Sequence, residues 1–114
     1  MFEGLDSVKT HYDSIKDNVG APEQILESVL NELGYLLLWQ SIDEAIDAFA
    51  LATELYPLSE NAWNSLSDGY LEAKSYGKAL AAIKKSIDIA KKHQSKNLEY
   101  FQGKHKGVLS KMKN

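Results

Sequence analysis

The segment NELGYLLLWQSIDEAIDAFALATELYP, residues 31–57, decides the fold of this 114-residue chain. Its apolar residues recur at intervals of three and four on both sides of a polar break at residues 40–41, which is the spacing of two amphipathic helices. Ser41 and Glu44 have the pattern of a capping box, in which the serine hydroxyl can accept from a backbone N–H of the first turn and the glutamate can reach back. Pro57 ends the second helix, so the segment predicts a helical hairpin.

The same hairpin occurs a second time further along the chain. A shift of 33 residues aligns the first helices, in which Asn31 meets Asn64. A shift of 34 residues aligns the second helices, in which Ala45 meets Ala79. The one-residue difference is a shorter turn at residues 40–41 of the first copy. Self-similarity at such a period is typical of helical repeat proteins.

Helical spacing extends to both flanks, and no segment alternates apolar and polar residues as a strand does. We therefore expect an all-α, single-domain chain over 1–114 with about six helices. Its parts are an N-terminal helix over 1–20, a first repeat over 24–58, a second repeat over 59–93 and a C-terminal capping helix over 95–113.

The repeat resembles the tetratricopeptide repeat, and this resemblance implies a short right-handed α-solenoid of two hairpins. The residues that carry it, expected to pack within and between the hairpins, are Leu33, Gly34, Ala45, Phe49, Ala52, Pro57, Trp63, Leu66, Tyr70, Ala79 and Ile83. Small residues are expected where two helices approach closely, and large ones between hairpins. The second copy departs from the pattern at Ser67 and Ser86, which stand where the first has Gly34 and Ala52. No proline follows the second copy, so its last helix is expected to be longer.

A second resemblance is carried by residues 31–38, 42–46, 49, 54–61, 65–66 and 69–70. They are similar to the C-terminal helical extension of some bacterial serine esterases of the α/β-hydrolase superfamily, related to siderophore esterases, and residues 11–12 and 22–23 are similar to the lead-in of that extension. This resemblance implies a non-catalytic protein-interaction module of a longer enzyme, serving intramolecular docking or homodimerisation. The alternative is a free-standing adaptor that binds an extended peptide.

A tetratricopeptide-type fold implies a concave groove lined by the first helix of each hairpin. Counting outward from the packing positions predicts these groove residues: Asn31, Tyr35, Leu38, Trp39, Asn61, Asn64, Asp68 and Leu71. Asparagines can hold the backbone amides of an extended peptide, and aromatic residues can anchor it. The groove so predicted has no basic residue, which argues against binding of a peptide's C-terminal carboxylate.

Charge is unevenly distributed along the chain. Residues 1–72 contain 14 acidic residues and two lysines, whereas residues 73–114 contain 11 lysines and two acidic residues. The asymmetry fits head-to-tail contact with a copy of the chain or with a charged partner, or simply two solvated surfaces. All 13 basic residues are lysine. Because guanidinium groups are lacking, nucleic acid is not an expected partner.

The sequence predicts no catalytic constellation. The nearest approach to a Gly-x-Ser-x-Gly nucleophile elbow is residues 65–69, which fall inside a predicted helix. His11, His93 and His105 lack metal-binding spacing, and the chain has no cysteine, so no metal or cofactor is expected. No apolar run reaches the length of a membrane span, so we expect a soluble protein without a membrane partner. Cytoplasm and periplasm both remain open.

Overall fold

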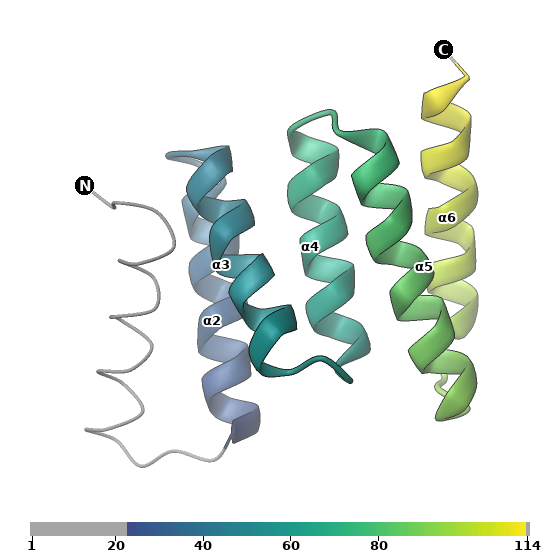
Figure 1. Ribbon diagram of the computed structural model, residues 1–114, viewed down its shortest axis with the longest axis horizontal. Coiled ribbons are helices and arrows are strands. Elements are labelled where there is room, and N and C mark those ends of the chain that lie inside the picture. The colour runs from purple at the N-terminus through teal and green to yellow at the C-terminus, as the bar shows by residue number, and fades with distance from the viewer. Residues whose placement is uncertain (1–22, 114) are drawn as a thin grey trace.

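The computed structural model of the protein describes residues 23–113. Over this range it is all-helical, with no strand and five helices: α2 (Glu23–Leu37), α3 (Ile42–Leu55), α4 (Glu60–Glu72), α5 (Tyr76–Lys92) and α6 (Leu98–Met112). Each helix packs against the next, and α2 also contacts α4. Figure 1 shows α2 and α3 at one end of the row, α4 in the middle and α5 and α6 at the other end. The all-α prediction is confirmed for residues 23–113, and the helix predicted over 1–20 lies outside the described residues.

Ser41 begins α3 as its capping pattern predicts, and Ser59 begins α4 in the same way. The Ser41 hydroxyl accepts from the backbone N–H of Glu44 at 3.3 Å, and the Ser59 hydroxyl accepts from the backbone N–H of Ala62 at 3.2 Å. Each bond satisfies one of the amides that the first turn of a helix leaves without a partner. Helix α5 has 17 residues against 14 in α3, in line with the missing proline after the second copy.

The ends of α4 and α5 use backbone caps that the sequence analysis did not predict. Lys74 and Gln94 adopt left-handed backbone angles, with φ of 60° and 52°. The backbone N–H of the residue that follows each of them donates to a carbonyl in the last turn of the helix. Ser75 N donates to Tyr70 O at 2.8 Å, and Ser95 N donates to Ala90 O at 2.9 Å. These are the long-range bonds of Schellman caps. Ser75 precedes the first residue of α5, but its hydroxyl makes no capping hydrogen bond to the first turn.

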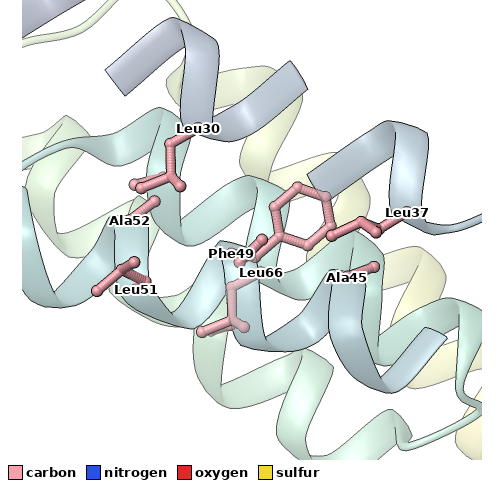
Figure 2. Packing of buried hydrophobic residues seen from close by; sticks show 10 residues of the cluster. Leu30, Leu37, Ala45, Phe49, Leu51, Ala52 and Leu66 are labelled. Atoms are coloured by element: carbon pink, nitrogen blue, oxygen red, sulfur yellow. The ribbon is translucent and has the colours of Figure 1, made fainter. Parts of the chain in front are cut away.

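Phe49 lies at the centre of the larger of two hydrophobic clusters. The ring is fully buried and points toward α2 and Leu37 (Figure 2). Ala45 and Ala52 are also fully buried on α3. A smaller cluster, formed by Ile83, Ala90 and Phe101 together with their neighbours, joins α5 to α6.

The second hairpin replaces two small apolar residues of the first with buried serines. Ser67 Oγ donates to the carbonyl of Ala79 at 3.0 Å, and Ser86 Oγ donates to the carbonyl of Glu60 at 2.9 Å. Both side chains are fully buried. A buried hydroxyl is costly unless it is hydrogen-bonded, and here each bond joins α4 to α5. The departures at Ser67 and Ser86 therefore keep the close helix contact and add a polar link.

In each hairpin, a glutamate at the same repeat position accepts hydrogen bonds from the loop that follows the hairpin. Glu27 Oε2 accepts from Ser59 Oγ at 2.8 Å. Its equivalent after a shift of 33 residues, Glu60, accepts from Ser95 Oγ at 2.7 Å and from Asn97 Nδ2 at 3.0 Å. In both cases the first helix of a hairpin holds the loop that follows its second helix. These equivalent hydrogen bonds of Glu27 and Glu60 were not predicted from the sequence.

Candidate functional site

A polar network crosses the surface formed by α2, α4 and α6. The hydroxyl of Tyr35 donates to Asp68 Oδ2 at 2.7 Å and lies 3.2 Å from Ser65 Oγ. From α6, Lys104 Nζ forms an ion pair with Asp68 and donates to Asn64 Oδ1 at 2.6 Å. Residues more than 30 positions apart in the sequence are thereby joined across three helices.

The expectation that this face has no basic residue is wrong. The side chain of Lys104 is only 11% exposed and that of Asp68 is 32% exposed, so the pair is largely withdrawn from water. The lysine was missed because it comes from the capping helix and not from either hairpin. Its charge is compensated by Asp68, and Asn64 and Asp68 are bonded within the chain.

The remaining predicted groove residues are scattered. Asn31 has a buried Oδ1 atom without a hydrogen-bond partner within the described chain. Leu38 and Leu71 are half-buried, and Asn61 is exposed in the first turn of α4. The structure thus joins Tyr35, Asn64 and Asp68 in one network but does not bring all eight residues into one polar site.

Burial raises the pKa of the Tyr35 hydroxyl above its ordinary value, and the hydrogen bond to Asp68 raises it further. The folded state therefore holds this proton at pH values where the unfolded chain has lost it. The stabilisation is fully present below the unfolded pKa of about 10 and is lost as pH rises above it.

We expect Tyr35→Phe to be less stable than the unmodified protein at pH 8, because the Asp68 bond is lost. Between pH 8 and pH 11 the stability difference between the two proteins should shrink, since phenylalanine does not titrate. Thermal unfolding of both proteins across this pH range measures the effect. Both proteins contain the same lysines, so the effect of lysine titration on stability cancels in the difference between them. A stability difference that stays constant between pH 8 and pH 11 would contradict the expectation.

Two large apolar side chains are strongly exposed at the end of α2. Trp39 is 89% exposed and Leu36 is 66% exposed. We call Glu32, Leu36 and Trp39 the Trp39 edge. One hollow of about 320 Å³ is lined by these three residues and Tyr35, and a second of about 330 Å³ is lined by Trp39, Tyr35, Leu38 and Glu72. Residues 23–72 contain ten acidic residues and no lysine, so the edge lies in an acidic part of the molecule.

A different hollow, of about 420 Å³, lies between α4 and α5. Its lining is Trp63, Leu66, Tyr70, Lys78, Ala81, Ala82 and Lys85, and we call it the lysine-rimmed hollow. Lys78 Nζ lies 5.9 Å from the ring centre of Tyr70, and Lys85 Nζ lies 5.8 Å from the ring of Trp63. Both distances suit cation–π contact.

This hollow was not predicted, because Trp63 and Tyr70 were assigned to packing. They are only half-buried, whereas Leu30 and Leu37, their equivalents in the first hairpin, are fully buried. Lys78 and Lys85 are seven residues apart, which places them on the same face of α5. This spacing was the sequence signal that could have revealed the site. Pro57, also assigned to packing, is exposed, and its carbonyl accepts from Trp63 Nε1 at 2.9 Å.

The stretch nearest to a nucleophile elbow is helical in the structure. Residues 65–69 lie inside α4, where the hydroxyl of Ser67 donates a hydrogen bond to the carbonyl of Ala79. In residues 23–113, no three His, Asp or Glu side chains converge as a metal site would require. None of the described helices combines the length and apolar character needed to cross a bilayer. Comparison of the chain with protein-family models, curated protein sequences and solved structures finds no match.

Proposed function

We propose that this chain is a non-catalytic, tetratricopeptide-type interaction domain that docks a protein surface through the Trp39 edge. Support for the repeat comes from the two hairpins related by shifts of 33 and 34 residues. It also comes from the close packing of Gly34 on Phe49 and from the glutamate that fastens each hairpin.

The exposure of Trp39 beside Leu36 carries the docking proposal. Leaving two large apolar side chains in water forfeits the free energy that their burial would contribute. Tryptophan is enriched at the centres of interfaces, where it supplies much of the binding energy. Clustered with two hollows, these side chains are typical of an interaction site rather than of an ordinary surface.

Two protein surfaces are candidates for the partner. One is the catalytic domain of a bacterial α/β-hydrolase esterase, attached to this chain or beside it. The other is a second copy of the chain itself. Both fit a module whose own described residues contain no catalytic arrangement.

The test uses both candidates as probes. The double variant Leu36→Ala with Trp39→Ala should weaken binding at least about tenfold, to a second copy or to an added siderophore-type esterase catalytic domain. Analytical ultracentrifugation measures the first and titration calorimetry the second. Leu58→Ala, which removes a 73% exposed leucine between α3 and α4, is the matched control and should bind as the unmodified protein does. Absence of binding to both probes, or binding indifferent to the double variant, would sink the proposal.

A second candidate function is that of a free-standing adaptor for an extended peptide. The observation that favours it is that the buried Asn31 Oδ1 has no hydrogen-bond partner among residues 23–113, so that a peptide N–H could supply one. Against it, Asn64 and Asp68 are already bonded to Lys104. Peptides selected from a random library on the protein should lose affinity for Asn31→Ala if this function holds.

A further inference from the structure

We infer that the lysine-rimmed hollow receives the Trp39 edge of a second copy, so that copies of the chain associate head to tail. This rests on the proposed function, because it names the partner of the Trp39 edge. The two surfaces belong to different parts of the molecule, one at the end of α2 and one on α4 and α5 (Figure 1).

The charges of the two surfaces are complementary. Residues 23–72 hold ten acidic residues and no lysine, whereas residues 73–113 hold 11 lysines and two acidic residues. The Trp39 edge carries Glu32, and the rim of the hollow carries Lys78 and Lys85. Opposite potentials accelerate encounter and disfavour contact between like surfaces, so the acidic half is directed to the basic half of another copy.

The apolar parts are complementary as well. The edge projects Leu36 and Trp39, and the hollow offers Trp63, Leu66 and Tyr70 as its aromatic and aliphatic floor. Ala81 and Ala82 at its side add little bulk, which lets another helix approach closely. A tryptophan ring in this hollow would meet aromatic rings and two ammonium groups, all of which attract its face or edge.

The spacings of the two surfaces also match. Glu32 and Trp39 are seven residues apart, as are Lys78 and Lys85 on α5. At 1.5 Å per residue the two lysines lie about 10 Å apart along α5, and Glu32 lies about 8 Å along α2 from Leu37, two residues before Trp39. With α2 of one copy laid along the hollow of the other, Glu32 meets one lysine while Trp39 lies near the second.

The hollow is a specific departure from the repeat. At the positions equivalent to Lys78, Ala81 and Lys85, the first hairpin has Glu44, Asp47 and Leu51, and Leu51 is buried. At these positions the second hairpin therefore presents an exposed, basic surface, whereas the first has two acidic residues and a buried leucine. The contact is heterologous, because it joins two different surfaces of the chain. A row of copies therefore always has a free Trp39 edge at one end and a free lysine-rimmed hollow at the other.

The test uses two variants that each disable one side of the contact. The edge variant is Leu36→Ala with Trp39→Ala, and the hollow variant is Lys78→Glu with Lys85→Glu. The changed lysines and the changed edge residues are exposed, so both variants should keep their thermal unfolding midpoint. The matched control is Lys84→Glu with Lys91→Glu, which alters two exposed lysines of the same helix by the same charge at the same spacing, outside the lining of the hollow.

Sedimentation velocity over a range of concentrations gives the readout. We expect the unmodified protein and the control to associate, at least about tenfold more weakly in 500 mM than in 50 mM salt. Each disabled variant alone should remain monomeric. Their equimolar mixture should form a heterodimer and nothing larger, because the edge variant keeps its hollow and the hollow variant keeps its edge.

Three results would overturn the inference, and they separate it from the proposed function. A monomeric unmodified protein at all concentrations excludes self-association, but leaves the esterase domain as partner of the Trp39 edge. Association of the hollow variant at normal strength means that the edge docks elsewhere on the second copy. If the edge variant still associates with itself, both the inference and self-association through Trp39 are wrong.

Discussion

Replacing Phe49 with alanine is expected to lower the free energy of unfolding by about 3–5 kcal/mol. The ring is fully buried on α3 and packs edge-on against Tyr35 of α2, with the ring centres 4.8 Å apart. On its other side it lies against Gly69 of α4. Its loss would leave a cavity at the junction of three helices.

Urea unfolding followed by circular dichroism measures the loss. If Phe49→Ala does not fold at all, Phe49→Leu keeps the comparison measurable, because leucine fills part of the space and should cost less. Leu58→Ala removes an exposed apolar side chain and should change stability by less than about 0.5 kcal/mol. A loss of less than about 1 kcal/mol for Phe49→Ala would show that Phe49 is not the centre of the core.

Replacing Gly34 with alanine is expected to cost about 1–3 kcal/mol, although alanine is the better helix former. A Cβ atom on Gly34 would lie 2.6 Å from Cδ1 and 2.8 Å from Cζ of the Phe49 ring. These atoms are too close for any packed contact, so α2 and α3 would have to move apart. The steric cost therefore outweighs the gain in helix propensity.

Gly103→Ala is the matched control, since Gly103 also lies inside a helix but its Cβ would meet nothing within 4 Å. It should stabilise the protein by about 0.5–1 kcal/mol, so the same substitution has opposite signs at the two sites. Combining Gly34→Ala with Phe49→Leu isolates the cause. Leucine lacks the outer ring atoms, so Gly34→Ala should cost less in that background, and an equal cost would locate the clash elsewhere.

Much of the local structure could be predicted from the sequence. The serine caps of α3 and α4 and the break at Pro57 depend on residues within a few positions of each other. Ala45 was identified by the repeat, since a shared packing geometry constrains equivalent positions in both copies, and Gly34 was identified by the resemblance to the tetratricopeptide pattern. The Schellman ends at Lys74 and Gln94 were missed, because neither residue is the glycine that normally marks them.

The candidate sites were only partly predictable. Trp39 and Tyr35 were named because they follow the helix period outward from buried leucines. The pairing of Lys104 with Asp68 spans 36 residues and depends on how α6 packs beside α4. The lysine-rimmed hollow depends on how far α4 and α5 leave Trp63 and Tyr70 uncovered, which the repeat pattern alone assigned to packing.

The sequence by itself determined that the chain is helical, where most of the described helices begin and end, and which small residues lie at the helix crossings. These properties follow from backbone hydrogen bonding and from the 3.6-residue period, which act over a few residues. Only the tertiary structure decided which side chains meet between helices and which remain exposed. Trp39, Lys104 and the two lysines of the hollow acquire their surroundings from helices distant in the chain, whose packing no local pattern encodes.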